Sequence, residues 1–202
     1  MCRFGLALSL AFATAGIAAP GLKEKPALYY PTKEGDSRVY EMKRKDGTST
    51  EYIQAVTQVE RKGDVVHVTL TMVEGGETTL WAEVEVSQAG VVHRTSAGRK
   101  LDPPKTVIKL PFKPGEKWDY QPKPEGGGPV GKRNYASVAE EEVEVPAGKY
   151  KAIRIDETWE DRRGPVRSSQ WHAPGVGLVK QSTFEGSTET GVYVLKSFKP
   201  GK

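Results

Sequence analysis

The sequence is poor in cysteine, the residue that forms disulfides and thiol nucleophiles. Cys2 is the single cysteine among 202 residues, and it precedes an apolar run near the N-terminus. A chain cleaved after that run would have no disulfide, thiol nucleophile or thiolate metal site. Lipid attachment through Cys2 is not expected either, because a lipoprotein cysteine follows the apolar run. Stability must therefore come from a packed core.

Other classes of protein are excluded by what the composition lacks. No second long apolar stretch, heptad repeat or collagen-like glycine period occurs, which rules out polytopic membrane proteins, coiled coils and collagen. The formal net charge is only +4, and the longest basic run is Lys43–Lys45. Because the remaining charges are scattered, they indicate a solvated surface, and we expect no nucleic-acid partner. A hydrophobic fraction of 37% is enough for one globular domain.

The N-terminus has the three parts of a secretory signal peptide. A short basic start precedes an apolar run over Phe4–Ala15, and small residues follow. Gly16 and Ala18 place the cleavage site after Ala18, with Ala19 as the alternative. A permanent transmembrane helix needs roughly 20 apolar residues, and this run is shorter. We therefore expect a signal peptide over 1–18, a periplasmic or extracellular location, and no membrane span after cleavage.

Beyond residue 36 the sequence alternates between apolar and polar residues. Two segments put aliphatic side chains on one face: Val66, Val68, Leu70 and Met72, then Leu80, Ala82, Val84 and Val86. Trp81 falls on the opposite face of the second segment. A period of two is typical of antiparallel strands with one buried face, and glycine-containing turns separate the segments.

This pattern predicts an all-β fold built as an antiparallel meander. The expected strands lie near 37–45, 50–61, 65–74, 77–87, 91–96, 117–121, 134–145, 149–160, 166–172, 177–184 and 188–198. Residues 99–109 are predicted to be a short helical turn or an extended crossover. The Asp102-Pro103-Pro104 sequence favours the crossover, because residues before proline avoid the helical region.

The two halves of the chain repeat a motif. Residues 31–40 and 111–120 both fit P-x-K-x-G-[DE]-x-x-x-Y, and further glycine and tryptophan landmarks follow in the same order in each half. The repetition indicates an internal duplication, in which each half covers the sheet face of the other. The alternative is that the motif simply recurs wherever a loop leads into a strand.

The resulting domain organisation is one β domain after a linker. We expect the linker over 19–36 and the domain over 37–198, with pseudo-repeats over about 31–98 and 111–198. The two halves would form stacked curved sheets, a half-barrel or a barrel. The sequence leaves these arrangements open.

Three motifs resemble the signatures of one exported bacterial family. Pro111–Trp118 fits P-x-K-x-G-x-x-W, Val145–Ala152 begins with V-P-A-G-x-[FY], and Trp171–Lys180 follows W-[YF]-A-P-G-V-G-x-V-[KR] apart from its second residue. Over roughly residues 28–198 the chain resembles an exported bacterial β-protein family that includes TapB-like proteins and is mostly of unknown function. The resemblance implies a β fold and an envelope location. It implies no activity.

Two residues depart from the signatures of that family. Arg38 stands in the first half where the motif usually has tryptophan, and His172 replaces the usual tyrosine or phenylalanine. The matching motifs carry no established catalytic role, so the resemblance leaves the function open.

Sequence motifs for catalysis and cofactor binding are incomplete. Gly126–Lys132 fits G-x-x-x-x-G-K but lacks the Ser or Thr that would hold Mg²⁺, so we interpret it as a glycine loop between strands. The three histidines, His67, His93 and His172, have no metal-ligand spacing. Acidic residues fall in outward rows, and no G-x-S-x-G elbow occurs. We expect no cofactor, no metal and no enzymatic activity.

Aromatic side chains are the remaining candidates for a site. The residues that we single out for ligand binding or core packing are Trp81, Trp118, Trp159, Trp171 and His172. The leading hypothesis is an exported, non-enzymatic envelope protein that binds a ligand or a protein partner through its sheet surface or loops. A structural component that pairs through β edges is the second hypothesis, and a hydrolase is the third.

Overall fold

The protein consists of antiparallel strands joined mostly by short turns. The structure, a computed structural model, describes residues 27–123, 131–162 and 164–202. The predicted signal peptide and the glycine-rich stretch 126–130 lie outside the described residues. The strands are β1 (Ser37–Arg44), β2 (Ser49–Lys62), β3 (Val65–Glu74), β4 (Glu77–Ser87), β5 (Gly90–Ser96), β6 (Arg99–Lys109), β7 (Lys117–Tyr120), β8 (Arg133–Val145), β9 (Gly148–Asp161), β10 (Gly164–Ala173), β11 (Gly177–Glu185) and β12 (Thr188–Lys199). Within the described ranges, no helix is long and apolar enough to span a membrane.

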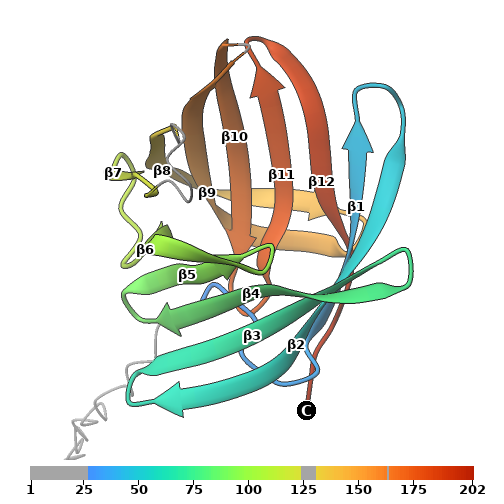
Figure 1. The fold of residues 1–202 in the computed structure, drawn as a ribbon, viewed down its shortest axis with the longest axis vertical. Helices are drawn as coiled ribbons and strands as arrows, with labels where there is room; N and C mark the ends of the chain where they lie inside the picture. Colours follow the sequence, from blue (N-terminus) through green and yellow to red (C-terminus); the bar gives the residue numbers. More distant parts are fainter. Residues whose placement is uncertain (1–26, 124–130, 163) are drawn as a thin grey trace, which may run out of the picture.

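All twelve strands belong to one sheet, in the order β6-β5-β4-β3-β2-β1-β12-β11-β10-β9-β8-β7. Every sequential pair except β6 and β7 is hydrogen-bonded, and β1 also pairs with β12. The sheet curls into a nearly closed barrel, with β1–β6 forming one side and β7–β12 the other (Figure 1). The predicted all-β meander is confirmed, and of the arrangements left open by the sequence the barrel is the one observed.

The barrel closes between β6 and β7 through isolated bonds instead of a continuous ladder. Across this seam, Trp118 Nε1 donates a hydrogen bond to the Thr106 carbonyl at 3.0 Å. The Lys123 backbone N–H donates to the Asp102 carbonyl at 2.7 Å. The two outer strands therefore face each other, and side chains and one loop join them.

The prediction of a turn or crossover over 99–109 is wrong, because this segment is the edge strand β6. The residues between Lys100 and Lys105 lie opposite a single residue of β5, Arg94. Asp102-Pro103-Pro104 falls inside this irregular stretch, where prolines need no partner for a missing N–H. Edge strands tolerate proline for this reason. The sequence signal identified the irregularity and missed the strand on both sides of it.

A β-bulge in β4 overturns the predicted position of Trp81. Leu70 pairs with Ala82 and Thr71 pairs with Leu80, so Trp81 has no partner across the ladder. The extra residue shifts the alternation. Trp81 packs against the interior cluster of buried residues, while Leu80, predicted to be buried, is 43% exposed.

The buried residues form two clusters. The larger one draws side chains from β2–β6 and β7–β9, including Leu70, Ile108 and Ile155. The smaller one lies where the β8–β9 hairpin meets β1 and β10–β12, and it includes Val143 and Leu195. The Ala147 N–H donates to the Leu195 carbonyl at 3.1 Å, which fixes this turn against β12. The β8–β9 hairpin thus packs against strands near the middle of the sheet order.

The two P-x-K-x-G loops have the same backbone geometry. Gly35 and Gly115 have φ angles of 84° and 82°, a conformation that favours glycine. The Gly35 N–H donates to the Val56 carbonyl at 2.9 Å, and the Gly115 N–H donates to the Ser137 carbonyl at 2.7 Å. Each loop is thereby fixed to the second strand of its half. The duplication and the domain boundaries remain predictions.

Candidate ligand chamber

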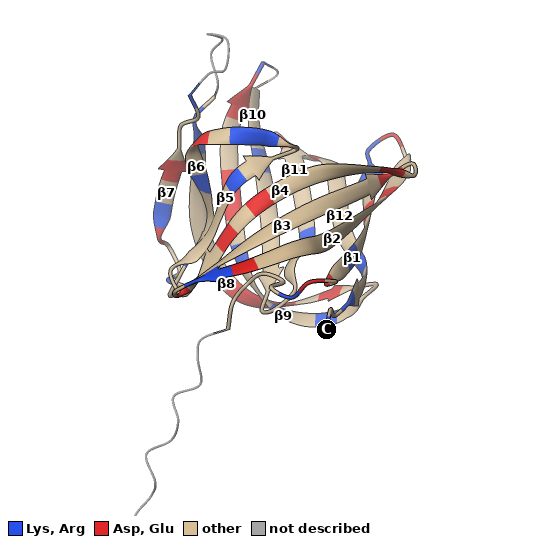
Figure 2. Ribbon diagram, turned by 60° about the horizontal axis from the view of Figure 1, so that its bottom comes forward, with Lys and Arg blue, Asp and Glu red and all other residues tan. Residues whose placement is uncertain are grey.

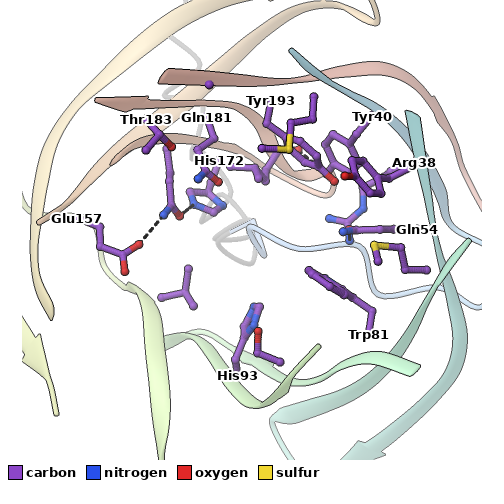
Figure 3. Close-up of a pocket in the computed structure, with 18 of the residues that line it drawn as sticks. Arg38, Tyr40, Gln54, Trp81, His93, Glu157, His172, Gln181, Thr183 and Tyr193 are labelled. Atoms are coloured by element: carbon purple, nitrogen blue, oxygen red, sulfur yellow. Dashed lines mark hydrogen bonds between the residues drawn. The ribbon is translucent and has the colours of Figure 1, made fainter. Parts of the chain in front are cut away.

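A chamber of about 620 Å³ lies inside the barrel. Its walls come from β1–β6 and β9–β12, so both halves of the chain contribute (Figure 3). Ligand-binding cavities commonly have volumes of about 300–1,000 Å³. The chamber is therefore large enough for a small molecule, and its chemistry depends on the side chains that reach into it.

Arg38 is the most unusual residue of the chamber wall, because its guanidinium is buried without a carboxylate. The residue is 3% exposed. Nη1 donates to the Val176 carbonyl at 3.2 Å, and Nη2 donates to Gln54 Oε1 at 3.0 Å. The Tyr30 and Tyr40 rings lie 5.3 and 5.7 Å from its central carbon. No ion pair of Arg38 exists among the described residues, so neutral groups alone hold the cation.

A hydrogen-bonded chain orients His172 on the opposite wall. Arg133 Nη1 donates to Glu157 Oε1 at 2.6 Å, and Gln170 Nε2 donates to Glu157 Oε2 at 2.9 Å. The Gln170 Oε1 atom then faces His172 Nε2 at 3.4 Å. Because a carboxamide oxygen only accepts, Nε2 of a neutral His172 carries the proton and Nδ1 has the lone pair. Nδ1 is buried and has no hydrogen-bond partner in the described structure.

Both chamber histidines are uncharged at neutral pH. Burial lowers the pKa of His172 to about 3, and the positive charge of Arg38 acts in the same direction. Burial also lowers the pKa of His93 to about 3, helped by Lys105, His172 and Arg38. His93 is partly exposed, but it faces the chamber and meets the Tyr30 ring edge-on at 6.1 Å. The histidines therefore line the chamber as neutral groups.

The other charged groups on the wall largely offset each other. Burial opposes ionisation of Glu157, yet Lys105 and Arg133 hold its pKa below the usual value. Burial lowers the pKa of Lys105, whose ammonium lies 5.8 Å from the Tyr135 ring. Glu74 is an exposed residue at the end of β3. Arg38 is thus the buried chamber charge that has no opposite charge beside it.

The chamber becomes apolar along β1. Arg38, Tyr40 and Met42 alternate onto its wall, and four residues of strand span about 13 Å. Met42 pairs with Tyr193 of β12, whose ring stacks on Tyr40 with centroids 4.5 Å apart and lies 6.1 Å from the Tyr52 ring. One direction through the chamber therefore leads from a cation to a flexible thioether and aromatic rings.

Two of the five residues singled out from the sequence lie in this chamber. Trp81 and His172 are part of its wall, on opposite sides (Figure 3). Trp118 instead seals the seam, where its ring stacks on Tyr135 at 5.5 Å with an interplanar angle of 10°. Its position results from β7 being the edge strand beside β6.

The other two tryptophans pack against charged side chains away from the chamber. The Arg133 guanidinium lies 4.6 Å from the Trp159 ring centroid. Trp171 Nε1 donates to Glu141 Oε2 at 2.8 Å, and the Arg154 and Lys180 side chains lie over its ring. Adjacent residues on β10 point to opposite faces, which separates Trp171 from His172.

Sequence reasoning missed Arg38, His93, Gln54 and the methionines as wall residues. One signal was available for Arg38, because it shares the face of Tyr40 and Met42 in an alternating strand and replaces a tryptophan in the repeated motif. The closure of the barrel brings β1, β5 and β10 around one space, and no local pattern contains that information.

No arrangement of three or more potential metal ligands occurs within the described ranges. Figure 2 shows acidic and basic residues spread over many strands, as the scattered sequence charges indicated. The chamber is consequently the feature of the described residues with the most specific chemistry.

Comparisons with known proteins give a fold. No family model matches the sequence, and no curated protein matches it significantly. A solved structure of a "putative exported protein with YmcC-like fold" from Bacteroides fragilis NCTC 9343 is similar, with a TM-score of 0.62 and 15% identity over 86% of this chain and 100% of that chain. A "putative lipoprotein" from Parabacteroides distasonis ATCC 8503 has a TM-score of 0.55 and 12% identity, over 87% of this chain and 100% of that chain. Identities this low establish a shared fold, and the resemblance to TapB-like proteins remains a prediction.

Proposed function

We propose that this is an exported, non-enzymatic protein of the cell envelope that binds a small molecule inside its barrel. The observation that carries the proposal is the buried, unpaired Arg38 in the wall of a chamber of about 620 Å³. Buried charges in proteins are normally paired, because removal from water is costly. A ligand would supply the missing partner for the cation.

Export is supported by the N-terminal sequence and by the names of the structural neighbours. The apolar run over Phe4–Ala15 with small residues after it is typical of a secretory signal. One neighbour is named as exported and the other as a lipoprotein. Both names agree with a periplasmic or extracellular location for this chain.

A binding role is favoured over hydrolysis by the contacts of the polar groups. A hydroxyl nucleophile needs a base within hydrogen-bond reach. Within the described residues, His172 Nε2 contacts the Gln170 amide, and no histidine bonds to a serine or threonine. Glu157 accepts bonds from Arg133, Tyr135 and Gln170, which commits both its oxygens.

Binding inside the barrel is also favoured over assembly through free strand edges. The two edge strands, β6 and β7, lie against each other and are linked by the Trp118 and Lys123 bonds. β-augmentation requires a row of unpaired backbone groups that a partner can reach. The Trp118 and Lys123 bonds occupy part of these edges.

Native mass spectrometry tests the proposal on mature protein purified gently from its own envelope fraction. We expect a retained small mass, and its removal should change the tryptophan emission of wild type through Trp81. A W81F variant should lose that change, whereas W159F should keep it. Bare protein in every gentle preparation would contradict the proposal.

A further inference from the structure

We propose that the chamber ligand is an amphipathic carboxylate, with its head group at Arg38 and its apolar chain directed toward Met42. This inference rests on the proposed function and specifies the class of molecule. Three features of the wall support it: its charge, the orientation of the guanidinium, and the change in polarity along β1.

The charge at Arg38 differs from that at the paired arginines of the barrel. Arg94 contacts Glu85 at 2.6 Å, Arg133 contacts Glu157 at 2.6 Å, and Arg154 contacts Asp156 at 2.9 Å. These three lie within reach of solvent, where pairing matters least. Arg38 is far more buried and has no acidic partner in the described residues. An anion is therefore the ligand group that compensates the largest uncompensated charge.

The surroundings of Arg38 favour one negative charge on the ligand. Its nearest polar neighbours are neutral: the Val176 carbonyl, the Gln54 amide and the rings of Tyr30 and Tyr40. The chamber histidines are uncharged, and the other wall cation, Lys105, is influenced electrostatically by Glu157. A second negative charge at Arg38 would meet no second cation among the neutral groups around the guanidinium. A single carboxylate matches the charge of the site.

The guanidinium is held in place before any ligand arrives. Val176 accepts its bond from the turn before β11 and Gln54 accepts from the neighbouring strand β2, and two tyrosine rings flank the guanidinium. A planar, preorganised guanidinium recognises a carboxylate better than a flexible ammonium does. Figure 3 shows Arg38 and Gln54 together on the wall opposite Glu157.

The chain of the ligand follows the apolar side of the chamber. Met42 lies four residues beyond Arg38 on the same strand face, about 13 Å away along β1. Tyr193, the partner of Met42 on β12, and Tyr52 line this end as well. Methionine side chains adapt to the shape of an apolar ligand, so an alkyl chain suits this part of the wall better than a sugar or a peptide.

Isothermal titration of the mature protein with three ten-carbon probes tests the inference. The probes are decanoate, decan-1-ol and decyltrimethylammonium, which share a chain and differ in head-group charge. We expect decanoate to bind at least about tenfold more tightly than decanol, as a charge-assisted hydrogen bond predicts. We expect the cation to bind most weakly.

An Arg38→Met variant should reduce decanoate affinity to that of decanol and leave decanol affinity unchanged. Arg94→Met is the matched control, because it makes the same change at a surface ion pair and should behave as wild type. If R38M does not fold, the order of the three probes on wild type decides the question by itself.

The outcomes separate the two proposals. Equal affinity for decanol and decanoate, or unchanged selectivity in R38M, would overturn the carboxylate assignment and leave the binding function in place. Failure of all three probes, with another mass retained in native spectra, would do the same. Failure of all three together with bare protein from the envelope would overturn both proposals.

Discussion

The loops that lead into β1 and β7 share their backbone bonds, yet the side chains that follow them have opposite effects. Three residues after each glycine, β1 carries Arg38 and β7 carries Trp118. Arg38 brings a buried charge to the wall of a chamber. Trp118 stacks on Tyr135 and closes the seam to β6. One backbone unit therefore serves a site in one half and closure of the barrel in the other.

The tyrosines two residues further on differ in the same sense. The Tyr40 hydroxyl donates to the Leu178 carbonyl at 2.7 Å, whereas the buried Tyr120 hydroxyl has no partner in the described structure. The β1 position is thus tied to β11, the strand next to its neighbour β12. Equivalent backbone positions in the two halves are therefore specialised by a few side chains.

The largest expected effect is a loss of stability on mild acidification, originating on the chamber side. The pKa values of His93 and His172 are about 3 in the folded protein, below the ordinary value of 6.5. The unfolded chain therefore binds more protons between these values, so their contribution is complete above pH 6.5 and is lost as pH falls. The free energy of unfolding should drop by at most about 1.4 kcal/mol per pH unit for each histidine.

Urea denaturation between pH 7 and pH 5 measures this slope above the range in which carboxylates titrate. A variant with both His93→Gln and His172→Gln should lose most of the slope, whereas His67→Gln should retain it. A wild-type stability that stays flat over this range would contradict the assignment of buried neutral histidines.

The next largest effect is expected at the seam. Trp118→Ala removes the stacking on Tyr135 and the bond to the Thr106 carbonyl, so we expect a loss of about 3 kcal/mol of unfolding free energy. Trp159→Ala is the matched control, because that ring packs on Arg133 away from the chamber and should cost about 1 kcal/mol. Equal losses in chemical denaturation would show that closure of the seam adds nothing.

A smaller effect on stability is expected for Arg38→Met. The variant loses two hydrogen bonds but no longer buries an unpaired charge, and these changes oppose each other. The free energy of unfolding should stay within about 1 kcal/mol of wild type in urea denaturation without ligand. A loss as large as that of Trp118→Ala would mean that Arg38 is needed for the fold itself.

The smallest difference should separate Gly35→Ala from Gly115→Ala. Both glycines have positive φ, and an added Cβ meets no close atom at Gly115 and only ordinary contact at Gly35. Each variant should lose about 1 kcal/mol through backbone strain alone. Thermal unfolding of the pair measures this, and clearly unequal losses would show that the two loops are not equivalent.

Local sequence patterns predicted most of the fold because each strand carries its own alternation and turn. The pattern failed where one residue more or fewer changes the pairing. At Trp81 the bulge reverses which side chains face inward. Between Lys100 and Lys105 the prolines interrupt the strand pattern of β6, so the sequence did not predict a strand there. Such irregularities depend on the neighbouring strand, so a single segment does not reveal them.

The candidate site was less predictable than the fold. Trp81 and His172 stood out by residue type, but Arg38 and His93 are separated by more than fifty positions and meet only through barrel closure. The tryptophans at 159 and 171 stood out equally and lie elsewhere. Residue type alone therefore does not distinguish a chamber wall from a packed outer face.

The pairing of β1 with β12 has a consequence for how the protein reaches its final state. Ser37 pairs with Lys199, so one edge of β1 gains its backbone hydrogen bonds only when β12, the last strand, is in place. Contacts this distant along the chain make folding slow. A chain emerging from its N-terminus would keep β1 half-paired until the end of synthesis or translocation.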